Sequence, residues 1–474
     1  MGGLSKKAYQ ILNLEREENQ QRLLLDAGNL LFKRPKVQEG PSQESLAAET
    51  IIDIYKELGY DAVGIGPLDL AGPIDLLKNS RDAGFPWISA NLADEQGKPL
   101  FKQWVNRKAG ETEIYITALT APPGKKLPGI KILETEAVIP KLLKKFKNVK
   151  QNPFIILLST LSNAENRKIT EQYPDINLII GADRSSVNIS PKHINNSLFT
   201  QTEKQGKYQG LLQIIFGTTR QWGQDSSKQL ADLQNKLGSL NWQLRRLEKK
   251  AKLAGQNEKF KATISRLINE KGAMNTKIDS LKEIVQQKKK SGAVNDQFIY
   301  RFIKLKKNMP NDMSTVEKLH ILNSKIRKLH KNNKKTKQAS KLIKGMAGYA
   351  VCETCHEAQF KFWENSMHAS AFMTLVDKNK QYNLDCLPCH LTVDASNVAF
   401  KIVTSRGYLS YPAKMQSVGC ESCHGPGKSH SLDPDTVAML RLPDKQTCLT
   451  CHTSEHDDNF DYDVKIQNIS CPAS

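Results

Sequence analysis

The residues with the clearest chemistry are eight cysteines and four histidines that recur in one pattern in the last third of the chain. In each repeat two residues separate a pair of cysteines, and a histidine follows directly. The two thiols can add to the vinyl groups of one porphyrin while the histidine reaches the iron, so the pattern is the attachment signature of c-type haem. It predicts four covalently bound haem c groups and electron transfer. The repeats are Cys352-Glu-Thr-Cys355-His356, Cys386-Leu-Pro-Cys389-His390, Cys420-Glu-Ser-Cys423-His424 and Cys448-Leu-Thr-Cys451-His452.

Two other kinds of site use paired cysteines. A zinc ion shared by two pairs needs four sulfur or nitrogen ligands, and that arrangement requires no histidine after every second cysteine. A thioredoxin-like redox pair usually stands alone beside a βαβ pattern, which this region lacks. The haem interpretation is therefore favoured over both. The ninth cysteine, Cys471, belongs to no repeat and is interpreted as a free thiol near the chain end.

Each iron also needs a ligand on its other side, and three further histidines lie in the same segment. His368 lies in a predicted helix after the first repeat, His430 follows a tight Gly-Pro-Gly loop, and His456 lies just beyond the fourth repeat. Three candidate distal ligands cannot serve four irons, so the fourth iron takes a ligand from elsewhere or stays open. An open iron would allow a redox enzyme acting on a small nitrogen or sulfur compound. Alternative ligands are His320, His330, Met346, Met367 and Met415.

Residues 347–474 resemble the cytochrome c-552/c-554 family of tetrahaem proteins. The resemblance implies closely packed haems in electronic contact, with His368 and His430 as distal ligands, and it allows one five-coordinate haem. It supplies no substrate. The matching stretches are 363–371 (Trp-Glu-Asn-Ser-Met-His-Ala-Ser-Ala), 419–427 (Gly-Cys-Glu-Ser-Cys-His-Gly-Pro-Gly) and 448–455 (Cys-Leu-Thr-Cys-His-Thr-Ser-Glu).

Residues 1–222 have a different pattern, in which short β-rich apolar runs alternate with helical periodicity. This alternation is typical of an α/β layered domain, where chemistry lies in loops at strand ends. No apolar run approaches the ~18 residues needed to span a bilayer. Predicted strands cover 22–26, 61–65, 87–91, 113–119, 154–159 and 176–181, and predicted helices cover 42–58, 74–83, 132–146 and 163–172.

The loops of this region resemble those of the calcineurin-like metallophosphoesterases, particularly the 5′-nucleotidase branch. The resemblance implies a metallophosphoesterase-like sandwich with two metal ions that activate a water for attack on phosphate. The likeness runs through 2–7, 23–29 (Leu-Leu-Leu-Asp-Ala-Gly-Asn), 58–66, 89–92, 157–160 (Leu-Leu-Ser-Thr), 174–181 and 206–210.

The chain departs from that family at the ligand positions. Asn29 stands where the family has its bridging aspartate, Thr160 where it has a histidine, and Pro67 and Leu68 within its Gly-Asn-His-Asp loop. Proline and leucine side chains cannot ligate a metal ion. We therefore expect the fold to persist and the dinuclear site to be lost, leaving residual phosphoesterase activity as an alternative. Asp26, Asn29, Asp69 and Asp183 are a weak single-metal candidate or ordinary loop residues, and His193 is the region's only histidine.

Residues 223–346 combine helical heptads with strong positive charge. The seams predict a coiled-coil arm of two antiparallel helices with a turn at 255–257 and a third helix after them, or else a dimeric coiled coil. Residues 225–344 hold 30 Lys and Arg against 10 Asp and Glu, and this excess of 20 equals the net charge of the whole chain, +20. The seams are leucines 230–247 continued by Ala251 and Ala254, then 260–285, and then 319–329.

The basic arm favours an acidic redox partner or an anionic membrane surface, because opposite charges steer association. A solvated surface without a partner is the alternative, and nucleic acid is not expected because haem c is attached outside the cytoplasm. The protein is thus predicted to be periplasmic or otherwise extracytoplasmic. Residues 1–7 show no apolar segment of a signal peptide, and the family's first strand is missing, so we expect the natural chain to begin upstream.

Overall fold

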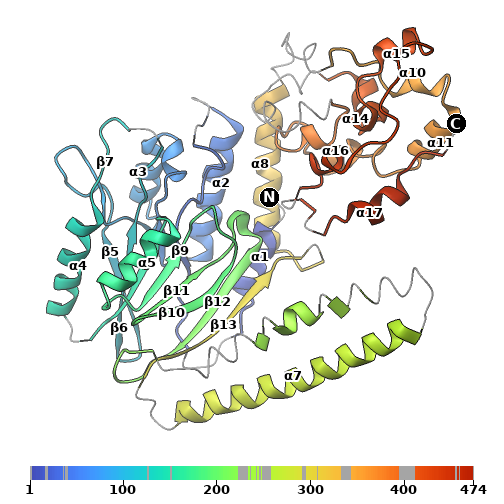
Figure 1. Ribbon diagram of the computed structural model, residues 1–474. Helices are drawn as coiled ribbons and strands as arrows, with labels where there is room; N and C mark the ends of the chain where they lie inside the picture. Colours follow the sequence, from blue (N-terminus) through green and yellow to red (C-terminus); the bar gives the residue numbers. More distant parts are fainter. Residues whose placement is uncertain are drawn as a thin grey trace. The chain divides into compact units, whose positions relative to one another are not determined.

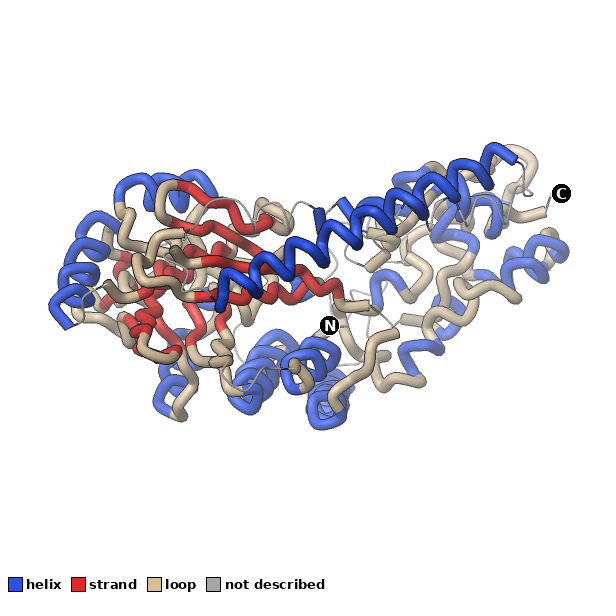
Figure 2. Tube along the Cα trace, turned by 90° about the horizontal axis from the view of Figure 1, so that it is seen from below, coloured by secondary structure: helices blue, strands red, loops and turns tan. Residues whose placement is uncertain are grey.

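The computed structural model divides the chain into two compact units. Unit 1 consists of Met1–Val37 and Ile51–Thr315, and unit 2 consists of Gln38–Thr50 and Val316–Ser474. Every strand in the described part of the chain belongs to unit 1, and unit 2 is built from helices and loops (Figure 2). The described residues are 3–15, 20–35, 37, 41–124, 127–149, 152–222, 233–234, 236–241, 243–244, 247, 258–290, 295–306, 308–331, 343–393, 411–453, 456–457 and 459–472.

Unit 1 is organised around a six-stranded sheet with the order β10-β11-β9-β8-β6-β5 (Figure 1). Its four inner strands run parallel, and the two edge strands pair antiparallel. β8 is buried along its whole length, as expected for a central strand covered on both faces. The strands are β5 (Trp104–Ala109), β6 (Thr112–Leu119), β8 (Phe154–Ser159), β9 (Leu178–Gly181), β10 (Ile189–Ile194) and β11 (Ser197–Gln201).

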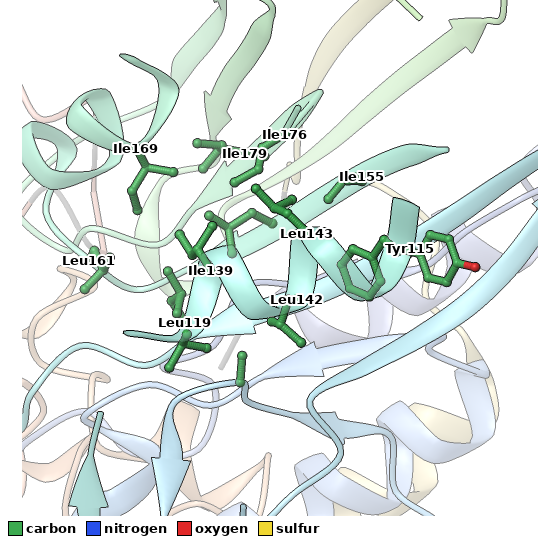
Figure 3. Close-up of a cluster of buried hydrophobic side chains, with 14 of the residues drawn as sticks. Tyr115, Leu119, Ile139, Leu142, Leu143, Ile155, Leu161, Ile169, Ile176 and Ile179 are labelled. Atoms are coloured by element: carbon green, nitrogen blue, oxygen red, sulfur yellow. The ribbon is translucent and has the colours of Figure 1, made fainter. Parts of the chain in front are cut away.

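Two helices, α4 (Thr135–Val149) and α5 (Asn163–Gln172), cover one face of this sheet (Figure 3). α4 presents apolar side chains at helical spacing, and its Phe146 ring stacks on Tyr115 of β6 with centroids 4.5 Å apart. α5 begins in a capping box, in which Ser162 and Glu165 satisfy each other's backbone N–H groups.

The opposite face packs on two small sheets. One contains the parallel strands β1 (Leu25–Asp26), β2 (Ala62–Gly64) and β3 (Trp87–Ile88), and the other pairs β12 (Tyr208–Ile215) with β13 (Gln297–Lys304). α2 (Gln43–Leu58) and α3 (Ile74–Asp82) link the three parallel strands in sequence. The predicted α/β architecture is therefore confirmed. The remaining short elements of unit 1 are α1 (Leu4–Leu12), η1 (Asp69–Ala71), β4 (Leu92–Ala93), β7 (Lys131–Ile132) and η2 (Lys204–Gly206).

The segment predicted as a helical arm contains a strand as well as helices. β13 lies within it because Phe298, Tyr300 and Phe302 alternate along an extended chain, and the first two are buried against Trp222 and its neighbours. α7 (Glu258–Lys290) matches the second predicted seam, and its Leu267 packs with Leu240 and Leu244. Leu230, Ala251, Ala254 and the turn at 255–257 lie outside the described residues.

Unit 2 consists of short helices joined by loops, in line with the predicted C-terminal helical region. The third predicted seam is α8 (Met313–Lys331), which begins in unit 1 and continues into unit 2. Among the described helices of the whole chain, none is both long and apolar enough to cross a membrane. The other elements are α10 (Tyr349–Glu353), α11 (Glu357–Glu364), α12 (Met373–Val376), η3 (Leu387–Cys389), η5 (Ala413–Met415), α14 (Cys420–His424), α15 (Lys428–Leu432), α16 (Lys445–Leu449), α17 (Tyr462–Lys465) and η6 (Ile466–Asn468).

Candidate haem-binding site

Each of the four Cys-x-x-Cys-His repeats lies on a turn of helix. α10 carries the start of the first repeat, η3 most of the second, α14 all of the third and α16 the start of the fourth. Residues three apart on a helical turn lie on one face, so both thiols of a repeat point the same way. None of the nine cysteines forms a disulfide.

Two of the motif histidines face a second imidazole. The ring centroids of His356 and His430 are 6.2 Å apart with planes 24° apart, and those of His368 and His452 are 6.2 Å apart with planes at 61°. Burial lowers the pKa of His368, which keeps that ring neutral and able to bind a metal. The structure thus places His430 near His356 of the first repeat and His368 near His452 of the fourth repeat. Both His430 and His368 are distal-ligand candidates from the sequence.

This spacing suits an iron atom between each pair of rings. Two metal–nitrogen bonds of about 2 Å, plus roughly 1 Å from each bonded nitrogen to its ring centre, add up to about 6 Å. The donor set therefore fits a bis-imidazole haem at both pairs.

The other ring nitrogen of several histidines is anchored by an acceptor. Nδ1 of His424 and Nδ1 of His430 donate to the carbonyl oxygens of Leu440 and Val437, at 2.7 and 2.6 Å. These contacts place the proton on Nδ1 and leave the Nε2 lone pair for a metal, as is usual for ligating histidines.

The second and fourth repeats have the same arrangement. Nδ1 of His390 lies 2.6 Å from the Ala371 carbonyl oxygen, and Nδ1 of His452 lies 3.0 Å from Oδ2 of Asp457. The face of the His452 ring also stacks on Phe460, with centroids 4.5 Å apart. The anchors come from loops and a carboxylate that no sequence motif marks.

Thiols of different repeats approach one another. A hydrogen bond with Cys420 lowers the pKa of the Cys352 thiol, and a hydrogen bond with Cys389 lowers the pKa of Cys451 to about 7. Burial raises the pKa of Cys423 to about 12. The first repeat therefore lies beside the third, and the second beside the fourth, which would bring their haems close together.

Large apolar side chains are unusually exposed around the repeats. Seven of the twelve exposed large hydrophobic residues of the described chain lie between 351 and 442, with Leu432 78% exposed and Met367 76% exposed. A contiguous apolar surface of this kind would be one that a partner or ligand covers. Porphyrin rings would supply that cover, and this is a second observation that fits haem. The seven are Val351, Phe362, Met367, Met373, Leu432, Leu440 and Leu442.

The remaining candidate ligands are scattered. His456 and His320 are exposed, and His330 is 3% exposed on α8. Met346 and Met415 are buried in the apolar core of unit 2, beside Leu387 and Cys386 of the second repeat. Neither His390 nor His424 faces another imidazole at comparable range in the described part of the chain. Cys471 is exposed, as expected for a free thiol near the end.

The loop residues of unit 1 are engaged with one another. The Asp69 carboxylate accepts hydrogen bonds from the backbone N–H groups of Gly66, Asn29 and Leu31, each at 2.8 Å. Asp69 is 1% exposed, and burial raises its pKa to about 6. Asn29, in the left-handed region with φ 60°, accepts from the N–H of Leu68 and donates to Ala182.

Asp26 and Asp183 are also occupied by neighbours. Asp26 accepts from the Tyr55 hydroxyl at 3.0 Å and lies 3.9 Å from the Lys7 ammonium. Asp183 accepts from backbone N–H groups of Asn163 and Ser185. His193 lies on the edge strand β10. Among the described residues no group of three or more His, Cys, Asp or Glu could hold a metal ion.

One buried carboxylate in unit 2 was not anticipated from the sequence. Glu421, inside the third repeat, is 1% exposed and accepts three backbone hydrogen bonds. Glu353 occupies the same place in the first repeat and is exposed. Haem attachment requires no particular residue between the two cysteines of a repeat, so no sequence signal distinguishes the buried Glu421 from the exposed Glu353.

Comparison with known proteins gives different matches for the two ends of the chain. Residues 351–425 match the family model described as cytochrome c554 and c-prime. Cytochrome c-554 of Nitrosomonas europaea is 31% identical over 101 residues, which is 18% of this chain and 40% of that protein. The family match indicates covalent haem c and an electron-transfer role for this segment.

A 5′-nucleotidase of Vibrio parahaemolyticus is 32% identical over 89 residues, 18% of this chain and 16% of that protein. The chain thus spans less than half of either relative. Among solved structures, the sulfate thiohydrolase SoxB of Thermus thermophilus matches with TM-score 0.38 and 17% identity, over 45% of this chain and 39% of that one. A 5′-nucleotidase precursor from the same species matches with TM-score 0.35 and 21% identity, over 46% of each chain. The matches fit a cytochrome c fused to a metallophosphoesterase-like domain.

Proposed function

We propose that this cytochrome c-type chain is an extracytoplasmic electron carrier with four covalently attached haems, one on each Cys-x-x-Cys-His repeat. The observation that carries the proposal is the presence of two histidine pairs, His356 with His430 and His452 with His368, each with ring centroids 6.2 Å apart, a separation that would accommodate an iron between the rings. The extracytoplasmic location is supported by the compartment in which haem c is attached.

The side chains of each repeat would have different roles in holding its haem. The two cysteines of a repeat would form thioether bonds to the porphyrin, and the following histidine would bind the iron. Carbonyl oxygens and Asp457 hold the Nδ1–H groups and so fix the direction of Nε2. Bound haem iron supplies one-electron oxidation and reduction. His356 with His430 and His452 with His368 would each supply two imidazoles to one iron, which would suit these two centres to electron transfer alone.

A direct test is to purify the full chain after expression with a haem-attachment system. We expect a mass increase equal to four haems, a c-type absorption spectrum, and reduction and reoxidation of all four. Low-spin signals should account for at least two of the four irons in electron paramagnetic resonance. A chain that carries no covalent haem would overturn the proposal.

A second candidate function is a redox enzyme that binds a small nitrogen or sulfur compound at an open iron. It is favoured by His390 and His424, which are anchored for metal binding but face no second imidazole in the described chain. High-spin signals, and binding of carbon monoxide, nitrite or hydroxylamine, would support it. A fully low-spin spectrum would exclude it. In that case His456, Met346 and Met415 would be the candidates for the second ligand of the irons at His390 and His424.

The basic arm is proposed to associate with an acidic redox partner or an anionic membrane surface rather than with nucleic acid. The support is the excess of 20 positive charges in residues 225–344, a sequence charge that steers encounter. The contact of Leu267 with Leu240 and Leu244 supports the antiparallel hairpin, with a dimer through the same seam as the alternative. Binding to anionic vesicles that weakens with salt, and light scattering for the oligomer, would separate these outcomes.

Unit 1 is proposed to serve as a scaffold or docking domain without phosphoesterase activity. Its candidate ligands are engaged in internal hydrogen bonds, and Pro67 and Leu68 offer no donor atoms. Turnover of a generic phosphoester in the presence of manganese would contradict this assignment.

A further inference from the structure

Glu421 connects three parts of the haem-binding unit through one carboxylate. Oε1 accepts from the backbone N–H of Ala347 at 2.8 Å and from that of Gly427 at 2.7 Å, and Oε2 accepts from Gly348 at 2.8 Å. The side chain is 1% exposed. A buried carboxylate with three N–H donors is held in one position, because moving it would leave charged oxygens and backbone donors unsatisfied.

The segments that Glu421 holds lead to the two facing histidines of the first repeat. Gly348 immediately precedes α10, which carries Cys352 and leads to His356. Gly427 immediately precedes α15, which carries His430. The carboxylate therefore sits at the start of both helices, on a third helix, α14, that belongs to another repeat.

Neighbouring contacts stiffen the same junction. The N–H of Lys428 donates to the carbonyl oxygen of Gly345 at 2.9 Å, and the Lys414 ammonium donates to that of Ala347 at 2.7 Å. A Cβ atom added at Gly427 would lie 3.3 Å from Oε1 of Glu421 and 3.2 Å from Cε of Met439. The loop before His430 is thus closely packed against the glutamate.

We infer that Glu421 is a positioning residue that sets the separation of His356 and His430, and so secures the second axial ligand of the first haem. The inference rests on the proposed function for the presence of that haem. Glu353 is its natural control: it has the same residue type and the same place between the cysteines of the first repeat, but it is exposed. Comparing the two glutamates therefore separates the effect of burial from the effect of position within a repeat.

The test uses haem-loaded full-length chains carrying Glu421→Gln, Glu353→Gln, His430→Ala, or Glu421→Gln with His430→Ala. Glutamine has one acceptor oxygen and places an NH₂ group against a backbone donor. In Glu421→Gln we expect one of four irons to change from low spin to high spin and one additional carbon monoxide to bind per chain. His430→Ala should give the same gain, and the double variant no more than either single one. Glu353→Gln should match the wild type.

A wild-type spectrum for Glu421→Gln, or gains that add in the double variant, would overturn the inference. If Glu421→Gln fails to load haem, Gly427→Ala is the second probe, because its new methyl group would lie 3.2 Å from Cε of Met439 and 3.3 Å from Oε1 of Glu421 in the loop before His430. It should give a partial high-spin fraction, and an unchanged low-spin spectrum would count against the inference. Absence of covalent haem in the wild type would instead refute the proposed function.

Discussion

Unit 1 and unit 2 both hold polar side chains that the sequence singles out as candidate ligands, but the hydrogen bonds of these side chains differ between the two units. In unit 1 the oxygens of Asp69 and Asp26 accept hydrogen bonds from their own loops and from Tyr55. In unit 2 a carbonyl or carboxylate engages Nδ1 of the histidine, which leaves Nε2 directed elsewhere.

The comparison shows that the presence of a ligand-type residue does not by itself leave a donor atom available to a metal ion. The hydrogen bonds of Asp69 stabilise a loop, whereas those of His424 and His430 set a tautomer and an orientation. The two units also differ in how far their apolar side chains are buried. Unit 1 has two buried clusters on its main sheet, while unit 2 leaves Leu432 and Met367 largely exposed beside the repeats. Unit 2 thus combines one buried apolar cluster with exposed apolar side chains that the proposed haems would cover.

The largest effect is expected from removing one attachment site. Replacement of Cys448 and Cys451 by alanine should lower the haem content by a quarter, seen as a mass loss of one haem. Because the proposed porphyrins would cover apolar surface in unit 2, that unit should also become more sensitive to protease while unit 1 does not. Four haems in the variant would break the comparison.

The next largest effect concerns the core of unit 1. Phe154→Ala should lower the free energy of unfolding by about 3–5 kcal/mol, because Phe154 is fully buried among Phe216 and Trp222. Denaturant unfolding would measure the change. Val187→Ala, at a side chain 67% exposed, is the matched control and should stay within about 0.5 kcal/mol. Haem content should be the same in both, and a loss of haem in Phe154→Ala would show that the units are not independent.

A smaller effect is expected from pH. Burial raises the pKa of Asp69 to about 6 from its ordinary 3.8, so the folded state holds the proton more tightly than the unfolded state. The associated stability is fully present below about pH 4 and is lost as pH rises towards about 6, a change of up to about 3 kcal/mol at about 1.4 kcal/mol per pKa unit. The difference in unfolding free energy between wild type and Asp69→Asn should follow this curve. A difference independent of pH would contradict it.

The smallest effect is expected from a substitution in unit 1 that tests directly whether its metal site can be recovered. Asn29→Asp restores the residue type of the family at one ligand position, yet we expect no manganese-dependent hydrolysis of p-nitrophenyl phosphate above background. The new carboxylate would face the Ala182 carbonyl oxygen, and Asp69 would remain engaged by three N–H groups. The wild-type chain is the control, and any metal-dependent turnover in the variant would show that the site is recoverable.

Sequence patterns predicted those parts of the fold that depend on local periodicity. The strand at 154–159 and the helix at 163–172 were obtained with their observed bounds, because a buried apolar run and a capped helix are both encoded locally. β13 was missed, since its partner β12 lies about 90 residues earlier and heptad periodicity dominated the segment between them. Long-range strand pairing leaves little trace in either strand alone.

The candidate site likewise contains some residues that the sequence predicted and others that it did not. Cysteines and histidines of the repeats could be located from spacing alone, and His368 and His430 from resemblance. The anchors of the histidines could not, because Ala371, Val437 and Leu440 act through backbone carbonyl oxygens that every residue possesses. The burial of Glu421 is likewise a property of the three-dimensional packing.

The pairing of β12 with β13 also makes the intervening segment a cassette. The two strands are antiparallel neighbours from Ile215 opposite Gln297 onwards, and Asp296 closes the base by accepting from Gly217 and pairing with Arg220. Trp222 also forms a β-bridge with Asp296, so the entry and exit of residues 223–294 are adjacent. Loop closure grows only slowly more costly with length. Because Trp222 itself is buried in the core, we expect a short turn that replaces only residues 223–294 to leave the sheet and its host domain in place.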